Sequence, residues 1–324
     1  MPDEELRGMT KSKQDRDGII VLGHPRSGTT LLRRLLAAHP NIACPGETHI
    51  LNACARFLSA DVNSDGLDMG VLTGLTFAGF GENDVLEQLR EFAFSFPRRY
   101  AARKSKPRWA EKTAIDSFYV NEIERLCADD AYFVLVLRHG GDVAISSKDL
   151  VDEAGTYFEE FHPYIRRYKT PLLAFAHSWV DVTQSLLRFA DSHPENCVVC
   201  RYEDLLEAPE DVLTGLLEFV GEQWNDALLG DALSEVGETG LGDWRSYQRT
   251  DITTTSVGRW ESLPEHLLGE LAEVLNATLE ECGYETINPR RALSSSEIRR
   301  RYEFGLMTHS AMGAKQIKHS HNQA

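Results

Sequence analysis

Hydrophobic residues along the chain gather in short continuous runs that alternate with helical stretches. Three runs have the pattern of strands buried on both faces: GIIVLG at 18–23, AYFVLVLR at 131–138 and CVVCRY at 197–202. Stretches with helical periodicity stand between them, among them TTLLRRLLAAH, SFYVNEIERLCA and the long segment 170–193. Buried strands that alternate with helices predict an α/β fold with three layers, α/β/α, around a central and mostly parallel sheet.

The same pattern predicts the domain organisation. Residues 1–17 are polar and charged and lack the apolar core of a signal peptide, so we expect a flexible N-terminal segment. Residues 18–290 carry the strand and helix pattern and are predicted to form a single domain, with a less regular and mostly helical region over 48–110. Over 291–324 we expect a C-terminal helix followed by a disordered polar tail.

Composition narrows the class of protein. Of the 324 residues, 42% are hydrophobic, which is enough to form a buried core. The net charge of -16 argues against a general nucleic-acid binder, because such proteins carry surplus lysine and arginine. No apolar run is long enough to span a bilayer, and we expect a cytoplasmic protein.

The first predicted strand leads into a glycine loop, GHPRSGTT at 23–30, and then into a helix. Gly23 and Gly28 have the spacing of a Walker A loop, but the lysine that follows the second glycine in such loops is absent. Backbone N–H groups and the positive end of the helix dipole still make this loop an anion site. Polar side chains are supplied by Arg26, Ser27, Thr29 and Thr30. The missing lysine fits a phosphosulfate better than ATP, because a terminal sulfuryl group carries less charge and has less need of Mg²⁺.

Four motifs in chain order resemble those of sulfotransferases that use 3′-phosphoadenosine 5′-phosphosulfate (PAPS). PRSGTTLL resembles their 5′-phosphosulfate loop, and LRHGGDVAISS, with Arg138 and Ser146, resembles their 3′-phosphate clamp. CVVCRYEDLL, with Tyr202, resembles a strand segment that supports the nucleotide, and TTSVGRWESLPEHL, with Ser256, resembles the loop that closes over it. The resemblance implies PAPS as co-substrate, adenosine 3′,5′-bisphosphate as product and no metal, with 48–110 on the acceptor side.

Two positions depart from the pattern of the cytosolic members of that family. Their R-K-G triplet before the final V-G-x-W is replaced by three threonines at 253–255, so part of the 3′-phosphate contact must come from elsewhere, with Arg245 and Arg249 as candidates. The aromatic residue that often follows the second threonine of the loop is Leu31 here, so another side chain must stack on adenine.

The general base is predicted from a second resemblance, to tyrosylprotein sulfotransferases. Their G-E-T motif, in which the glutamate is the base, corresponds to GET at 46–48 and therefore to Glu47. The geometry agrees: the helix after the loop carries the chain ~15 Å away, and eight extended residues can return it over ~26 Å. His49 is the rival base, because alternation in an extended chain places it on the same side as Glu47.

Glu47, Arg26 and Lys112 form the predicted catalytic set. Lys112, in AEKTA, resembles the lysine that stabilises the leaving phosphate, and Arg26 is a candidate for the same role. The predicted reaction is in-line transfer of the sulfuryl group from PAPS to a hydroxyl of a peptide tyrosine, carbohydrate, lipid or small molecule. The basic run at 98–108 is compatible with an anionic acceptor, and the oligomeric state is left open.

Two other classes of function remain as alternatives at this point. A metal-dependent P-loop kinase for a small molecule would need an acidic Mg²⁺ ligand, for which Asp142 is the candidate, although a helix cap is its simpler role. A non-catalytic nucleotide-binding protein would keep the glycine loop but would not need the pair of Glu47 and Lys112.

Overall fold

The computed structural model describes residues 16–59, 70–225, 227–234 and 254–289, together with a few helical residues between 296 and 306. These residues form two compact units. Unit 1 takes the chain up to Arg138 together with Phe158–His162 and Asp181–Thr254, and unit 2 takes His139–Tyr157, Pro163–Val180 and the chain from Thr255 onward.

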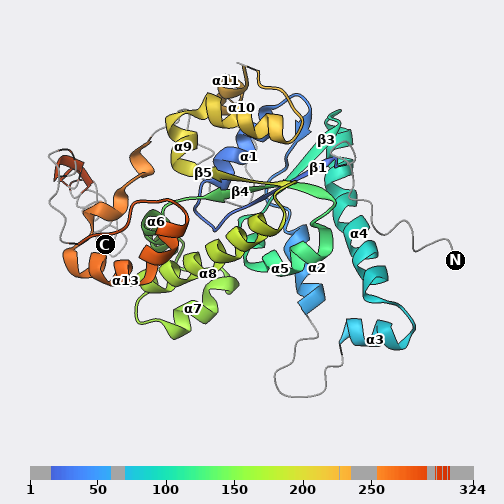
Figure 1. The fold of residues 1–324 in the computed structure, drawn as a ribbon, viewed down its shortest axis with the longest axis horizontal. Helices are drawn as coiled ribbons and strands as arrows, with labels where there is room; N and C mark the ends of the chain where they lie inside the picture. The colour runs from blue at the N-terminus through green and yellow to red at the C-terminus, as the bar shows by residue number, and fades with distance from the viewer. Residues whose placement is uncertain are drawn as a thin grey trace, which may run out of the picture. The chain divides into compact units, whose positions relative to one another are not determined.

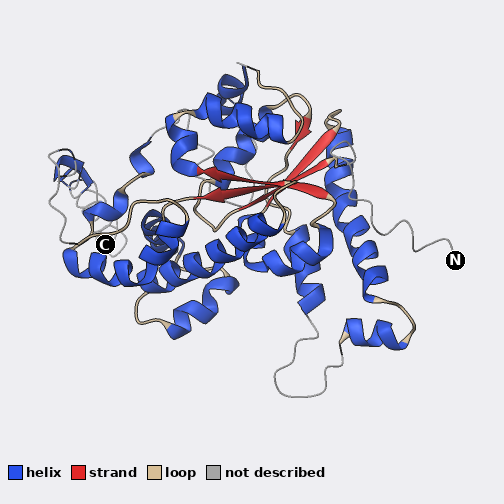
Figure 2. Cartoon of the chain, in the orientation of Figure 1, coloured by secondary structure: helices blue, strands red, loops and turns tan. Residues whose placement is uncertain are grey.

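Unit 1 is built around a five-stranded sheet in the order β2-β3-β1-β4-β5 (Figures 1 and 2). All neighbouring strands are parallel. The strands are β1 (Gly18–Leu22), β2 (Ile42–Ala43), β3 (Arg108–Lys112), β4 (Ala131–Leu137) and β5 (Cys197–Arg201). The predicted α/β class with a central parallel sheet is therefore confirmed, and the three apolar runs are β1, β4 and β5.

Helices cover both faces of the sheet. Side chains alternate along β1 and β4, so that Val21 and Val134 lie in one core, whereas Phe133 packs on Phe189 at 4.7 Å between ring centroids. The first face is covered by α1 (Thr29–Ala38), α9 (Tyr202–Glu207), α10 (Pro209–Phe219) and α11 (Ala227–Ser234) (Figure 1). The second is covered by α2 (Ile50–Ser59), α4 (Glu82–Arg103), α5 (Val120–Cys127) and the C-terminal half of α8 (Pro171–Ser192).

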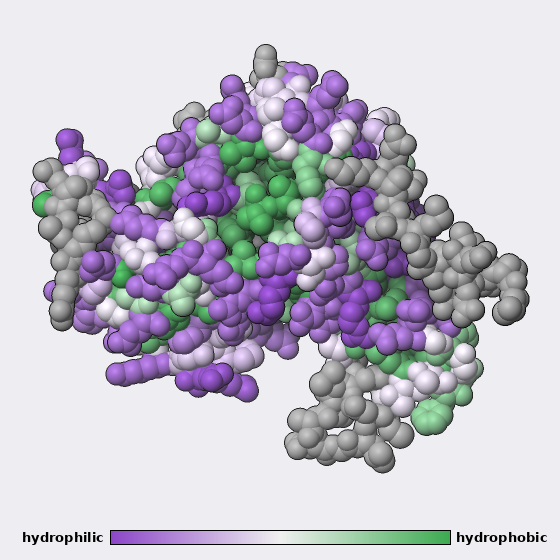
Figure 3. Space-filling view, in the orientation of Figure 1, coloured by the Kyte–Doolittle hydropathy of each residue, from purple (hydrophilic) through white to green (hydrophobic). Residues whose placement is uncertain are grey.

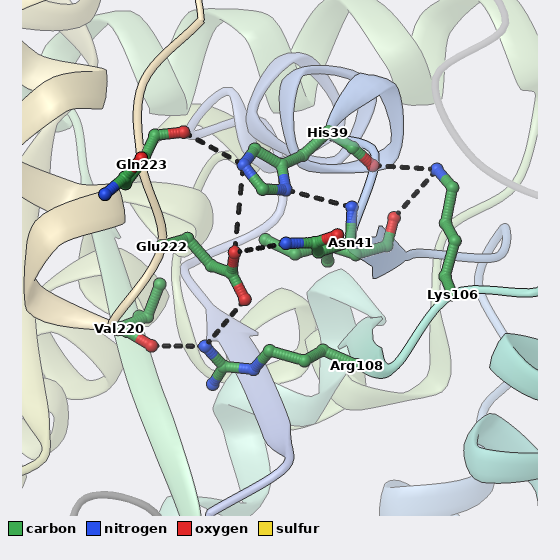
Figure 4. A network of polar contacts seen from close by, with 8 residues as sticks. His39, Asn41, Lys106, Arg108, Val220, Glu222 and Gln223 are labelled. Carbon is green, nitrogen blue, oxygen red and sulfur yellow. Dashed lines mark hydrogen bonds and ion pairs between the residues drawn. The ribbon is translucent and has the colours of Figure 1, made fainter.

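The end of α1 is fixed at the edge of the sheet where the strands begin (Figure 4). The Nζ of Lys106 donates hydrogen bonds of 2.6, 2.9 and 3.0 Å to the carbonyls of Ala37, His39 and Ile42. The carbonyls of Ala37 and His39 lie at the end of the helix, where backbone acceptors lack intrahelical partners, and Ile42 begins β2. A lysine ammonium therefore caps the negative end of the helix whose other end carries the glycine loop.

Part of the basic run at 98–108 is used by the fold itself, whereas Arg99, Arg103 and Lys104 are exposed. Arg108 donates to the carbonyl of Val220 and lies 3.4 Å from Glu222, and Arg98 pairs with Asp17 at 2.9 Å. The run precedes β3, so it lies at the edge of the parallel sheet opposite the carboxyl ends of the strands. This position gives no support to a role of the run in recruiting an anionic acceptor.

An exposed aromatic surface lies on α3 (Val71–Phe77), on α4 and on their connection. The aromatic residues exposed there are Phe77, Phe80, Phe92 and Phe96. Figure 3 shows apolar side chains at the lower right of the visible face, where Figure 1 places α3. Among the described residues, no helix combines the length and the apolar character needed to cross a membrane.

Unit 2 contains α6 (Gly140–Ala154), most of α7 (His162–Arg167), the N-terminal half of α8 and α13 (Glu265–Glu281). Two short 3-10 turns, η4 (Thr254–Ser256) and η5 (Arg259–Ser262), precede α13. The ring of Trp260 covers Gly141, where an added Cβ would lie 2.7 Å from the Cβ of the tryptophan. Glycine at the start of α6 thus lets η5 approach the helix closely.

The expectations for the two ends of the chain fall mostly outside the described residues. Of the predicted flexible segment 1–17, the structure describes Arg16 and Asp17, and the Nε of Arg16 donates to the carbonyl of Asp129 at 3.2 Å. Of 291–324, it describes helical residues between 296 and 306, and the predicted tail lies outside them. The chain divides into two compact units, and whether residues 18–290 form a single domain stays a prediction.

Candidate active site

The glycine loop lies between β1 and α1, at the carboxyl edge of the sheet. A Cβ on Gly23 would lie 2.7 Å from the carbonyl oxygen of Val136, and one on Gly28 would lie 2.1 Å from the ring of Tyr202. Gly28 also has φ of +93°, a left-handed conformation that suits glycine. It precedes the first turn of α1 without any side-chain cap. The N–H of Leu31 donates to the carbonyl of Gly28 at 3.0 Å, so the N–H groups of Thr29 and Thr30 are the ones that face a ligand.

Ser27 and Arg26 add side chains to this loop. The hydroxyl of Ser27 is buried and has no hydrogen-bond partner within the described part of the chain. Arg26 adopts φ of +76°, which is rare for a residue with a Cβ. Its carbonyl accepts a 2.6 Å hydrogen bond from Nη1 of Arg138, whose guanidinium lies 4.8 Å from the centroid of the Tyr202 ring. The ends of β1, β4 and β5 therefore bring these predicted binding residues together.

Glu47, Lys112 and Thr30 meet beside the same loop. Lys112 is at the end of β3 and its side chain is fully buried. Its Nζ lies 2.6 Å from Oε1 of Glu47 and 3.2 Å from Oγ1 of Thr30. A buried ammonium needs such partners, since an unpaired charge in the interior is costly. The chain after α1 does return to the loop, as the sequence predicted, and it places Glu47 there with 10% of its side chain exposed.

A second carboxyl group, Glu111, fixes the segment that carries Glu47. Oε1 of Glu111 accepts hydrogen bonds from the hydroxyls of Thr48 at 2.8 Å and Thr113 at 3.0 Å. Burial raises the pKa of Glu111 to about 7, because it outweighs the hydrogen bonds from the two hydroxyls, which lower the pKa. The sequence analysis did not identify Glu111, although in a strand it must face the side opposite to its neighbour Lys112.

Asp116 holds the start of α2 in a similar way. Its Oδ1 accepts hydrogen bonds from the backbone N–H of Asn52 at 3.1 Å and from the side-chain amide of the same residue at 2.9 Å. Burial, followed by the negative charge of Glu111, raises the pKa of Asp116 well above its ordinary value. The amide of Asn52 also lies 3.2 Å from Nδ1 of His49, so the imidazole contacts α2. These contacts tie His49 to α2, whereas Glu47 contacts Lys112.

Other residues predicted to contact the nucleotide or a metal are found in unit 2 or lie outside the described residues. Ser146 is on α6 and Ser256 ends η4, both in unit 2, whereas Arg138 belongs to unit 1. Arg245 and Arg249 lie outside the described residues. Asp142 is fully buried on the first turn of α6, and its two oxygens accept backbone N–H groups of the loop before α13.

A glycine loop between a strand and a helix, at the carboxyl edge of a parallel sheet, is typical of α/β proteins with a phosphate-loop architecture. The family model described as "Sulfotransferase family" matches residues 18–226. The chain belongs to the sulfotransferase family.

Relatives in sequence agree with this assignment. A putative protein-tyrosine sulfotransferase of Caenorhabditis briggsae is 25% identical over 284 residues, which are 83% of this chain and 89% of that protein. A protein-tyrosine sulfotransferase of Drosophila melanogaster is 26% identical over 217 residues, which are 65% of this chain and 39% of that protein. The chain thus spans most of the first relative and less than half of the second.

Solved structures show the same fold. The sulfotransferase domain from the curacin biosynthetic pathway matches with a TM-score of 0.57 at 20% identity, over 83% of this chain and 98% of that domain. The sulfotransferase domain of the Synechococcus PCC 7002 olefin synthase matches with a TM-score of 0.52 at 19% identity, over 92% and 98% of the two chains.

Proposed function

We propose that this protein transfers the sulfuryl group of PAPS to a hydroxyl of an acceptor, with Glu47 as general base. The observation that carries the proposal is the position of Lys112, which contacts Glu47 and Thr30 at once. It joins a proton acceptor to the phosphate loop through one buried cation. The tyrosine sulfotransferase relatives support a phenolic hydroxyl as the first acceptor to test.

The loop side chains fit a phosphosulfate. Ser27 offers a buried hydroxyl without a partner in the described chain, and the N-terminus of α1 offers backbone N–H groups. Arg26 and Arg138 bring positive charge to the same loop. Bound PAPS would supply the activated sulfuryl group, and these residues would hold its 5′ end.

The reaction then follows from ordinary acid–base chemistry. The acceptor oxygen attacks sulfur while the bond from sulfur to the 5′-phosphate oxygen breaks, so that adenosine 3′,5′-bisphosphate leaves. Glu47 takes the proton of the attacking hydroxyl. Lys112 and Arg26 offset the negative charge that develops on the departing phosphate oxygen.

The alternative functions find less support in the contacts. Both oxygens of Asp142, the acidic ligand that a metal-dependent kinase would use, accept backbone hydrogen bonds from Gly258 and Trp260. The contacts of His49 are with Thr113 and Asn52, which favours Glu47 as the base. A cytoplasmic location stays a prediction from the sequence, and fractionation of cells that express the tagged chain would test it.

The proposal is tested by comparing the wild type with Glu47→Gln in a transfer assay. Labelled PAPS is offered with a tyrosine peptide, a sugar, a lipid alcohol and a small phenol, and bisphosphate binding is measured by calorimetry. We expect Glu47→Gln to lower kcat by about 10² or more while the Kd of the bisphosphate changes by less than about threefold.

Glu222→Gln is the matched control, because Glu222 is also 10% exposed and ion-paired but lies at the opposite edge of the sheet. It should keep both turnover and binding. If Glu47→Gln retains turnover with every acceptor, Glu47 is not the base. Binding of ATP with Mg²⁺ but not of the bisphosphate would favour the kinase instead.

A further inference from the structure

Asp142 makes an unusual pair of contacts inside unit 2. Its side chain is fully buried on the first turn of α6. Oδ2 accepts the backbone N–H of Gly258 at 2.7 Å and Oδ1 accepts that of Trp260 at 3.0 Å. Charge-assisted bonds to backbone N–H groups are among the stronger hydrogen bonds in proteins. One carboxylate therefore fixes two positions of a loop that lies more than a hundred residues later in the chain.

The residues around this contact reinforce it. Arg259, which lies between the two donors, reaches Asp149 of α6 with 2.5 Å between Nη2 and Oδ2. The ring of Trp260 stacks on that of His139, with centroids 4.8 Å apart and planes 10° from parallel. The loop is thus held on α6 through the backbone at Gly258 and through both side chain and backbone next to it.

This attachment has a consequence for two serines of unit 2. Ser146 follows Asp142 by one helical turn and precedes Asp149 by another, so all three share one face of α6. Ser256 precedes Gly258 by two residues in the attached loop. Asp142 thereby fixes the segment of Ser256 on the face of α6 that carries Ser146.

We propose that Asp142 is a positioning residue for the second phosphate of the nucleotide, acting through the backbone of Gly258 and Trp260. The inference rests on the proposed function and extends it by taking Ser146 and Ser256 as the residues that contact the 3′-phosphate, as their motifs predict. Asp142 itself bears a negative charge and does not contact the phosphate. Its role is to hold the hydroxyl-bearing loop in place.

The sign of the effect separates this role from simple electrostatics. A carboxylate near a phosphate repels it, so removal of its charge alone would strengthen binding of the 3′-phosphate. Loss of the loop anchor would weaken it. In Asp142→Asn, an amide N–H₂ faces one of the two backbone donors, so one hydrogen bond is lost and the loop is released on that side.

The experiment compares the wild type with Asp142→Asn by calorimetry, using adenosine 3′,5′-bisphosphate and adenosine 5′-monophosphate. The two ligands differ only in the 3′-phosphate. We expect Asp142→Asn to weaken the bisphosphate by about tenfold and the monophosphate by less than about twofold. Asp152→Asn is the matched control: it makes the same charge change on the same helix, but its exposed ion pair is with Lys148 of α6 itself and not with the loop.

A second variant tests the same loop in case Asp142→Asn does not fold. Gly258→Ala leaves Asp142 intact and strains the loop, because Gly258 has φ of +71°. Like Asp142→Asn, it should weaken binding of the bisphosphate more than binding of the monophosphate. Backbone amide exchange at Gly258 and Trp260 should accelerate in Asp142→Asn and not in Asp152→Asn.

Each outcome has a distinct meaning. If the wild type prefers the bisphosphate and Asp142→Asn keeps that preference, the positioning role is refuted while the proposed function stands. An equal loss for both ligands also refutes it, because Asp142 would then support the nucleotide site as a whole. If the wild type shows no preference for the bisphosphate, the proposed function itself fails, and the positioning role fails with it.

Discussion

Replacement of Glu111 by glutamine should make the protein more stable at alkaline pH. In the unfolded chain this carboxyl group titrates near 4.5, whereas burial raises its native pKa to about 7. The folded state therefore holds the proton over a pH range in which the unfolded state has lost it. Stability is unaffected by Glu111 below 4.5 and falls as the pH rises toward 7.

The size of this effect follows from the displacement of the pKa. At about 1.4 kcal/mol for each pH unit, moving the pKa from 4.5 to about 7 costs roughly 3 kcal/mol of folding free energy once the group is ionised. Glutamine cannot ionise, yet its side-chain oxygen still accepts the hydroxyls of Thr48 and Thr113. The substitution removes the penalty and keeps the contacts.

Urea unfolding of both proteins at pH 5, 6, 7 and 8 and constant ionic strength measures the difference. We expect the two free energies of unfolding to be similar at the lowest pH, and Glu111→Gln to become the more stable by roughly 3 kcal/mol at the highest. Loss of the Glu111 charge also lowers the pKa of the buried Asp116, which acts in the same direction and adds to the stability of Glu111→Gln at high pH. Parallel curves across this range would show that burial does not hold Glu111 protonated.

Two further substitutions test other parts of unit 1. Gly28→Ala forces a Cβ onto the Tyr202 ring at positive φ, and we expect a loss of about 1–3 kcal/mol in urea unfolding together with weaker bisphosphate binding by calorimetry; wild-type binding would mean that the loop does not need this close approach. Lys106→Met removes the ammonium from the carbonyls at the end of α1, and should cost about 2–3 kcal/mol of stability while kcat and KM stay unchanged, because it lies at the opposite edge of the sheet. A kinetic defect in Lys106→Met would show that the end of α1 influences the loop.

The sequence predicted those parts of the structure in which local pattern and tertiary environment agree. The apolar runs that became β1, β4 and β5 are buried on both faces, so hydrophobicity alone identifies them. The glycine loop is also local, because Gly23 and Gly28 are required by close backbone approach. The return of Glu47 to the loop is allowed by chain geometry, since the extended segment after α1 can cover more than the length of the helix.

Other parts of the structure could not be predicted from local sequence, because the residues they contact are distant along the chain. β3, with the sequence RWAEK, lacks a hydrophobic run, and its charged residues are buried only because Glu47, Thr30, Thr48 and Thr113 satisfy them. Asp142 has the position of an ordinary helix residue, and its role depends on a loop near the other end of the chain. The basic run at 98–108 has a similar explanation, because its partners are backbone carbonyls and acids elsewhere.

The placement of β1 at the centre of the sheet determines when the site can form during synthesis. β1 and its loop leave the ribosome first, yet both neighbours of β1 are made later, β3 after about a hundred residues and β4 later still. Tyr202, on whose ring Gly28 packs, is synthesised more than half a chain length after Gly28. The loop therefore completes its contacts with Val136 and Tyr202 late, after β4 and β5 have been made.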